Sequence, residues 1–301
     1  MRWKKLGNIF CPSGNVPLLC SHAANPLAVH VEKNVFRIYF SGRDVHNKSS
    51  VGFFDYDIVL HKVIQQCTAP VFTYGAANTF YSHGVSIGNM YSAANKNYIL
   101  FMGWQMPENK HWRGDIGRIE MNGKNEFSLN PNSPFMGIDS EDPISLSYPW
   151  VMFHEGCYKM WYGSTLSWSS GNGEMVHVIK YATSNDAVRW QKHGVAIPFS
   201  LGVAQAFSRP TVIIDNSGYH MWYSFRSGDG TAYRIGYAHS FDGTNWTRKH
   251  TEAGIDISGS GWDNEMICYP FVFDFSGKRY MLYNGNGYGK TGIGLATLEH
   301  G

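Results

Sequence analysis

The stretch Tyr219-His-Met-Trp-Tyr223 decides the fold, because copies of it recur along the chain. Two copies are nearly as clear, Tyr158-Lys-Met-Trp-Tyr162 and Arg279-Tyr-Met-Leu-Tyr283, and two are weaker, Phe36-Arg-Ile-Tyr-Phe40 and Asn97-Tyr-Ile-Leu-Phe101. The last aromatic residue of each copy falls at positions 40, 101, 162, 223 and 283, so the intervals are 61, 61, 61 and 60 residues. A fixed period of this kind predicts a repeat architecture.

Proline residues give a second register with the same period. Each lies 13 or 14 residues before one of those aromatic residues, and Ile87 takes the place of the missing proline: Pro26, Pro149, Pro210 and Pro270. Five periods of about 61 residues account for the whole chain of 301 residues. We therefore expect five units in a single domain that spans residues 1–301.

The fourth unit shows what each repeat contains. The apolar run Thr211–Asp215 is followed by the turn residues Asn216-Ser-Gly218, and a second run covers residues 219–225. A third run, Tyr233–Ala238, precedes another turn at Asp242-Gly243. Short runs separated by such turns are typical of successive antiparallel hairpins. Three or four strands per unit, repeated radially, indicate a propeller blade.

The composition also favours this architecture. The chain has 33 Gly, 18 Phe, 18 Tyr and 10 Trp and only 16% charged residues, which suits short strands joined by tight turns. A stacked solenoid is the alternative, but it needs capping ends, and the fifth unit runs straight to the C-terminus. We therefore predict an all-β, five-bladed β-propeller with about 61 residues per blade. Residues 1–24 then complete the last blade or cover one end.

The charge and the remaining patterns exclude several classes of function. A net charge of +2 gives no basis for binding nucleic acid, and no run of 18 apolar residues predicts a membrane span. The N-terminus lacks the apolar run of a signal peptide, so we expect a cytoplasmic protein whose five cysteines are reduced. We predict no metal and no cofactor, because the sequence has no HxH or HExxH pattern and no phosphate-binding glycine loop. The oligomeric state is left open.

The residues before the proline positions predict a binding site at the centre of the ring. Side chains alternate along a strand, so these residues can face the axis while the following residues pack. All are polar or amphipathic: Asn25, Ser86, Tyr148, Arg209 and Tyr269. They predict a funnel for a polar ligand, unless they only mark the start of a strand.

The ends of the second strands carry a further set of candidate binding residues. Arg43 and Arg226 occupy equivalent positions, where a guanidinium could grip a carboxylate or phosphate or form an ion pair between blades. Asn286 and Trp104 lie at the corresponding places in other units. We expect Trp104 and Trp262 to stack on the C–H faces of a sugar.

The unit "Pro, β run, Gly-Tyr-x-Met-Trp-Tyr, Ile-Gly-Tyr-Ala-x-Ser-x-Asp-Gly-x-x-Trp" resembles the five-bladed β-propeller glycoside hydrolases of families 32, 43, 68 and 130. These include fructosidases, arabinan and xylan hydrolases and mannoside phosphorylases, and the resemblance covers residues 25–298. It is closest to a subgroup with an Arg-Asp motif like Arg43-Asp44 and a stretch like Gly261–Pro270, encoded among bacterial surface-polysaccharide genes. The resemblance implies an enzyme that cleaves or remodels a glycosyl bond in a surface-polysaccharide or nucleotide-sugar pathway. Its ligand would be a small sugar or nucleotide sugar.

The catalytic carboxylates of family 43 do not carry over to this chain. Asn25 stands where the resemblance implies the catalytic base, and Ser147 stands where it implies the acid. An amide has no titrating carboxyl group, so Asn25 cannot act as a general base.

Other residues could supply the two carboxylates that flank a glycosidic bond during hydrolysis. Asp44 has an Arg neighbour that favours its ionised form, and Glu265 precedes the fifth proline by five residues. The first and fifth units are neighbours in a ring of five, so we predict Asp44 and Glu265 as the catalytic pair. Asp263 and His83 are further catalytic candidates, and Asp142 takes the place in the third unit that Asp263 takes in the fifth.

Two alternatives to hydrolysis stay open at the level of sequence. The chain could be a catalytically silent module that binds a sugar or nucleotide sugar, because Asn25 and Ser147 replace carboxylates. It could also be a phosphorylase in which Arg43, Arg209 and Arg226 bind phosphate.

Overall fold

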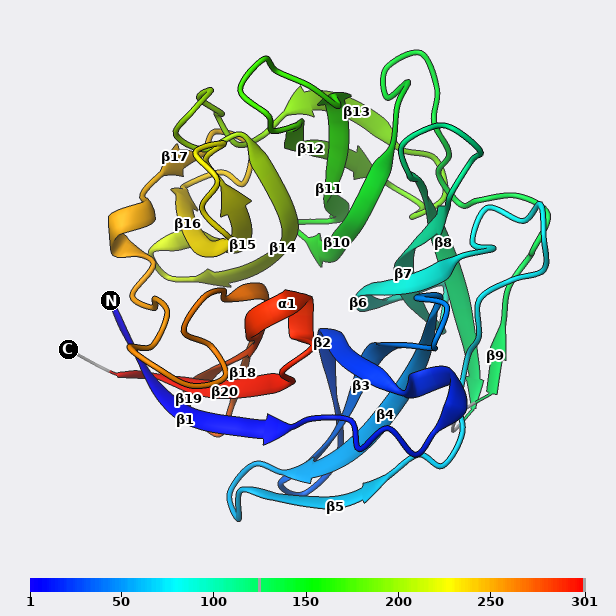
Figure 1. Ribbon diagram of the computed structural model, residues 1–301. Helices are drawn as coiled ribbons and strands as arrows, with labels where there is room; N and C mark the ends of the chain where they lie inside the picture. The colour runs from blue at the N-terminus through cyan, green and yellow to red at the C-terminus, as the bar shows by residue number, and fades with distance from the viewer. Residues whose placement is uncertain (124–125, 300–301) are drawn as a thin grey trace.

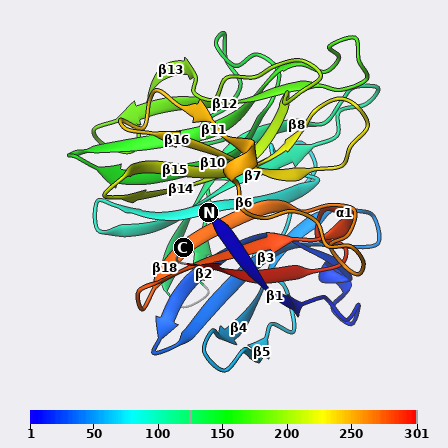
Figure 2. The same ribbon diagram turned by 90° about the vertical axis from the view of Figure 1, so that its left-hand side faces the viewer.

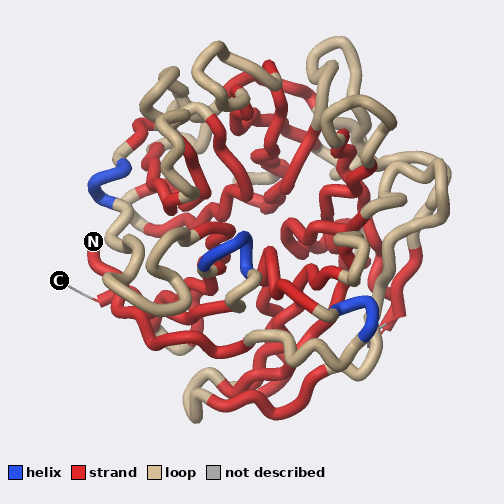
Figure 3. Tube along the Cα trace, in the orientation of Figure 1, coloured by secondary structure: helices blue, strands red, loops and turns tan. Residues whose placement is uncertain are grey.

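The computed structural model describes residues 1–123 and 126–299, which form an all-β structure with almost no helix, as the sequence predicts (Figure 3). In this part of the chain, hydrogen bonds join the strands into one four-stranded and two eight-stranded sheets. Each eight-stranded sheet consists of two antiparallel halves, joined by a single parallel residue pair at Ser49–Gly84 or at His177–Ala206. We call each half, and the four-stranded sheet, a strand group. The groups lie around a common centre (Figure 1).

The strands of each group follow one another along the chain, with one exception in the last group. The first two groups contain β2 (Ser21–Glu32), β3 (Val35–Arg43), β4 (Ser49–Asp57) and β5 (Lys62–Gln66), and β6 (Gly84–Ala93), β7 (Lys96–Gln105), β8 (Arg113–Gly123) and β9 (Glu126–Ser128). The next two contain β10 (Leu146–His154), β11 (Cys157–Ser167), β12 (Val176–Ser184) and β13 (Gln191–Val195), and β14 (Ala206–Asp215), β15 (Gly218–Arg226), β16 (Arg234–Ser240) and β17 (Thr247–Arg248). The four-stranded sheet contains β18 (Cys268–Phe275), β19 (Lys278–Asn284), β20 (Ile293–Glu299) and β1 (Arg2–Phe10). The helical segments are η1 (Pro17–Leu19), η2 (His250–Glu252) and α1 (Asn286–Gly289).

The two ends of the chain share one sheet. β1 pairs antiparallel with β20, from Arg2 opposite Glu299 to Phe10 opposite Ile293. The first and last described strands therefore lie side by side (Figures 1 and 2). Of the two places expected for the N-terminal residues, β1 takes the one that completes the last strand group.

The aromatic residues that define the repeat form the interior of the strand groups. The last aromatic of each copy is almost completely buried: Phe40, Phe101, Tyr162, Tyr223 and Tyr283. Burying one large apolar side chain contributes about 1.5–3 kcal/mol. The same requirement for a packed second strand in every group explains why these residues recur at a fixed period.

The first strand of each group is irregular at its proline position. Its pairing register shifts there, between Ala24 and Leu27 in β2 and at the matching places in β6, β10, β14 and β18. In four of these strands the residue before the proline has a positive φ: Asn25 at 56°, Tyr148 at 34°, Arg209 at 50° and Tyr269 at 53°. Such bulges bend a strand and redirect a side chain. Repetition of the bulge turns these residues toward one another.

Candidate functional site

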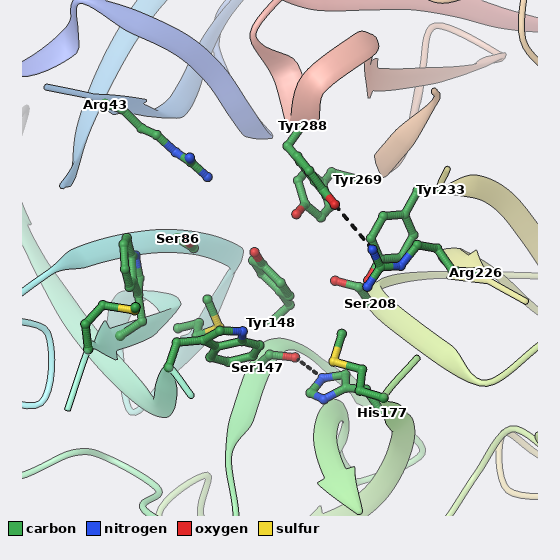
Figure 4. A pocket seen from close by; sticks show the side chains of 15 residues that line it. Arg43, Ser86, Ser147, Tyr148, His177, Ser208, Arg226, Tyr233, Tyr269 and Tyr288 are labelled. Carbon is green, nitrogen blue, oxygen red and sulfur yellow. Dashed lines mark hydrogen bonds between the residues drawn. The ribbon is translucent and has the colours of Figure 1, made fainter. Parts of the chain in front are cut away.

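A pocket of about 260 Å³ lies where the first strands and the ends of the second strands meet (Figure 4). Every strand group contributes to its wall, with Arg43 from β3, Trp104 from β7, Tyr148 from β10, Arg226 from β15 and Tyr269 from β18 among them. The lining is mainly aromatic, hydroxyl-bearing and cationic. No carboxylate of the described residues lines it.

Three of the five residues before the proline positions line this pocket. The rings of Tyr148 and Tyr269 lie 5.5 Å apart, and both line the pocket together with Ser86. A smaller adjoining cavity of about 30 Å³ is lined by the same three residues and by Asn25. Burial raises the pKa of both tyrosine hydroxyls above the ordinary value, so each is neutral at pH 7 and able to donate a hydrogen bond.

Arg209 lies behind this wall and does not line the pocket. Its side chain is fully buried, and Nη2 donates hydrogen bonds to the carbonyl oxygens of Pro26 and Gly88. Burial lowers the pKa of Arg209 to about 9, so the guanidinium remains charged at neutral pH. Nε and Nη1 have no hydrogen-bond partner among the described residues. Arg209 therefore links the backbone of β2 to that of β6 behind the pocket wall.

The two arginines at the ends of second strands both reach the pocket, but their charges are balanced differently. Arg226 Nη2 lies 2.9 Å from Glu174 Oε1, and the guanidinium lies over the ring of Tyr233 at 4.6 Å. Arg43 extends into the pocket from the other side (Figure 4) and forms no ion pair with the described residues. The uncompensated charge of Arg43 makes the pocket positive.

Only one of the two tryptophans predicted to stack on a sugar, Trp104 and Trp262, lines the pocket. Trp104 lines the pocket, and its Nε1 donates a hydrogen bond to Ser49 Oγ at 3.0 Å. Trp262 is not part of the lining, and its ring packs on Tyr283 at 5.3 Å. Asn286 is also outside the lining, because its Oδ1 accepts hydrogen bonds from the backbone N–H groups of the loop before β18.

The predicted catalytic pair does not meet in the pocket wall. The carboxylate of Asp44 accepts hydrogen bonds from the N–H groups of His46 and Lys48, at 2.8 and 2.9 Å, and so closes the turn after β3. The side chain of Glu265 is exposed. Neither residue lines the pocket, and a direct role of these two residues in catalysis stays a prediction.

Three other candidates are engaged away from the pocket. Asp263 is buried, with Lys5 Nζ at 2.7 Å and the Tyr283 hydroxyl at 3.1 Å. The fully buried Asp142 is held by Lys180 at 2.8 Å and by other donors, which keep its pKa below the ordinary value despite burial. His83 Nδ1 lies 3.2 Å from Ser82 Oγ, and burial and the nearby Lys48 lower its pKa.

Several residues of the pocket wall were not anticipated from the sequence, among them Trp112, His177, Tyr233 and Tyr288. Trp112 and Tyr233 belong to connections between strands, where the repeat has no register. His177 is buried in β12. The only feature of the sequence that could have pointed to it is its separation of 30 residues from Ser147, because the third strand of a unit can lie close to the first.

Residues 1–123 and 126–299 contain neither a cluster of metal ligands nor a helix that could span a membrane. No group of three or more His, Cys, Asp or Glu side chains in this part is arranged to hold a metal ion. None of its helices has the length and apolar character needed to cross a membrane.

Comparison with solved structures identifies the fold. A glycoside hydrolase superposes with a TM-score of 0.79 at 13% identity, over 99% of this chain and 92% of that one. A glycosyl hydrolase from Bacteroides ovatus gives 0.72 at 12% identity, over 98% and 92%. A structure from work on the GH130 family of mannoside phosphorylases gives 0.71 at 14% identity, over 97% and 91%. These likenesses confirm the resemblance to the propeller glycoside hydrolases at the level of fold.

Comparison with protein sequences gives nearer relatives. No family model matches the chain. Two Mycobacterium tuberculosis proteins, from different strains and named Uncharacterized protein Rv1502 and Uncharacterized protein MT1551, are each 43% identical over 302 residues, covering 100% of both sequences. The chain belongs to the same family as these mycobacterial proteins, and its fold is that of the propeller glycoside hydrolases.

Proposed function

We propose that this protein binds a sugar that carries a negatively charged group. The observation that supports this most directly is the composition of the pocket wall, where Arg43 and Arg226 stand among aromatic residues and no described carboxylate is present. A guanidinium binds a carboxylate or phosphate through directed, charge-assisted hydrogen bonds. Aromatic rings offer flat apolar faces to the C–H surfaces of a sugar.

The arrangement of the strand groups supports a finer proposal for the fold. We propose that the repeats are five blades of one closed ring, and that residues 1–301 form a single domain. In support, β1 completes the sheet of β18–β20, and the groups surround one centre (Figure 1). In this arrangement the pocket lies at the axis, where each blade supplies between one and five side chains.

Cleavage of a glycosyl bond is the second candidate function. The glycoside hydrolases and the GH130 protein that share the fold favour it. The unbalanced charge of Arg43 favours a version in which phosphate takes part, because phosphate would enter a pocket without competing carboxylates. A place in a bacterial surface-polysaccharide or nucleotide-sugar pathway, inside the cell, fits both candidates.

Isothermal titration calorimetry tests the proposed binding. We expect glucuronate and a glucose phosphate to bind more tightly than glucose, and Arg43→Gln to remove the difference. A lost charged hydrogen bond corresponds to about 1.5–3 kcal/mol, or roughly tenfold or more in affinity. Arg189→Gln is the matched control, because Arg189 is exposed and outside the pocket. Equal affinity for the charged and neutral sugars would contradict the proposal. Measuring the release of free sugar with and without phosphate tests the second candidate.

A further inference from the structure

Ser147 and His177 form a close hydroxyl–imidazole pair in the wall of the pocket. Ser147 Oγ lies 2.6 Å from His177 Nε2, and Figure 4 shows the two side chains pointing toward each other. Ser147 belongs to β10 and His177 to β12, so the intervening strand β11 sets their separation. Both side chains line the pocket although their exposed fractions are only 1% and 2%.

A third residue fixes the orientation of the imidazole ring. Thr165 Oγ1, from β11, lies 2.8 Å from His177 Nδ1. Both ring nitrogens are therefore held by hydroxyl groups, and Thr165 is itself fully buried. When Thr165 accepts the Nδ1 proton, the Nε2 lone pair faces the Ser147 hydroxyl. A nucleophile, a base and a group that orients the base recur in enzymes that act through an activated serine.

Gly163 provides the space for this pair. A Cβ atom added at Gly163 would lie 2.1 Å from Ser147 Oγ and 2.5 Å from His177 Nε2. Contacts this short force one of the neighbours to move, and both are held in a packed sheet. A side chain at position 163 and the Ser147–His177 pair are therefore mutually exclusive.

The imidazole is uncharged at neutral pH. Burial lowers the pKa of His177 to about 4, so the ring is uncharged at pH 7 and keeps a lone pair on one nitrogen. The pocket wall also contains Ser86 and Ser208, but no histidine is hydrogen-bonded to either hydroxyl among the described residues. Among the described serines of the pocket wall, the serine–histidine arrangement is thus specific to Ser147.

We infer that Ser147 and His177 catalyse acyl transfer from an ester. Ser147 Oγ attacks the ester carbonyl carbon while its proton passes to His177 Nε2. The bond from the carbonyl carbon to the alkoxy oxygen then breaks, and the leaving alcohol takes the proton from His177. Water attacks the acyl-serine in the same way, giving a proton to His177, which returns it to Oγ as the carboxylic acid leaves. The sum is ester plus water to acid plus alcohol, without any redox change.

The pocket indicates the chemical class of the substrate. Its wall contains the aromatic and cationic side chains already described. The ester is therefore an O-acyl group on an anionic sugar, and this substrate class rests on the proposed function. The acyl-transfer chemistry rests only on the Ser147–His177 pair. The two proposals can therefore fail separately.

Covalent labelling tests the nucleophile directly. We expect phenylmethylsulfonyl fluoride to add one sulfonyl group to Ser147 with loss of fluoride, detected by intact mass and peptide mapping. We expect release of 4-nitrophenolate from 4-nitrophenyl acetate to fall by on the order of a hundredfold or more in Ser147→Ala and His177→Gln. Ser240→Ala is the matched control, since Ser240 is a buried serine outside the pocket whose hydroxyl contacts Asp242 and no histidine, and it should retain both signals.

The outcome for the wild-type protein decides the inference even if a variant fails to fold. No adduct on Ser147 and no nitrophenolate release above that of Ser147→Ala would overturn it, including when charged sugars bind normally. Equal labelling of Ser208 would also overturn it. An adduct on Ser147 in a protein that binds none of the charged sugars supports acyl transfer and contradicts the proposed sugar specificity instead.

Discussion

The ammonium group of Lys5 lies 2.7 Å from the carboxylate of Asp263, and this ion pair ties the first strand of the chain to the loop before β18. The same carboxylate accepts a hydrogen bond from the Tyr283 hydroxyl at 3.1 Å. Asp142 repeats the arrangement with Tyr162 at 3.0 Å and with lysine partners. In both places a carboxylate clamps the loop before a first strand to the second strand of the same group.

We expect Asp263→Asn to reduce the free energy of unfolding by about 1–3 kcal/mol, because a buried charged partner of Lys5 and Tyr283 is lost. Urea unfolding measures the change. Asp256→Asn is the control, since the side chain of Asp256 is 75% exposed in its ion pair with Arg234, and such a pair contributes little. An Asp263→Asn protein as stable as the control would show that the clamp is dispensable.

The stability of the protein should fall when the pH falls from 6.5 to 4. Burial lowers the pKa of three histidines to about 4: His22, His177 and His250. The ordinary value applies in the unfolded chain, so the unfolded chain binds more protons between these two pKa values. The contribution of neutral, buried histidines is therefore complete above pH 6.5 and lost toward pH 4.

Urea unfolding at a series of pH values checks this, with His177→Gln as the diagnostic variant. We expect the loss of stability on acidification to be shallower in His177→Gln than in the wild type. His111→Gln should behave like the wild type because His111 is exposed. An unchanged slope in His177→Gln would refute the assignment of the effect to that residue.

Trp104→Ala and Trp262→Ala should separate binding from packing. Trp104 lines the pocket, so its removal should weaken the binding of a charged sugar, whereas removal of Trp262 should leave that binding unchanged. Trp262 packs on Tyr283, so its removal should lower the free energy of unfolding. The loss should be at most about 3–5 kcal/mol, because the side chain of Trp262 is only partly buried. Calorimetry and thermal unfolding of both variants give the comparison. The reverse pattern would place the sugar near Trp262.

Gly163→Ala should disturb the Ser147–His177 pair without removing either residue. The added methyl group overlaps both side chains, and overpacking of this kind typically costs about 1–3 kcal/mol of stability. We also expect loss of sulfonyl labelling at Ser147. Gly259→Ala is the control, because a Cβ at that position meets nothing within 4 Å. Normal labelling of a stable Gly163→Ala protein would mean that Ser147 stays reactive when the added methyl group moves it away from His177.

The all-β fold and part of the pocket wall could be predicted from the sequence because both follow local rules that repeat. The aromatic residue of each second strand must be buried, and the bulge at each proline turns the preceding residue, such as Tyr148 or Tyr269, toward the centre. The surroundings of Asp263 could not be predicted, because Lys5 lies 258 residues away in the chain. Trp112 and Tyr288 were missed for a different reason, since they reach the pocket from connections that have no repeat register.

The pairing of β1 with β20 has a consequence for how the chain acquires its structure. As the ribosome synthesises the chain, β1 emerges before the other described strands but its sheet partner β20 emerges 283–297 residues later in the paired positions. The last strand group therefore assembles after all the others, by contacts of very high sequence separation, which is the slow class of folding event. Until then β1 exposes an unpaired edge, so nascent chains are most exposed to misassembly at this strand. Joining the neighbouring ends of the chain and opening it between two strand groups, in the connection of residues 196–205 between β13 and β14, would make β20 and β1 neighbours in sequence without dividing another strand group.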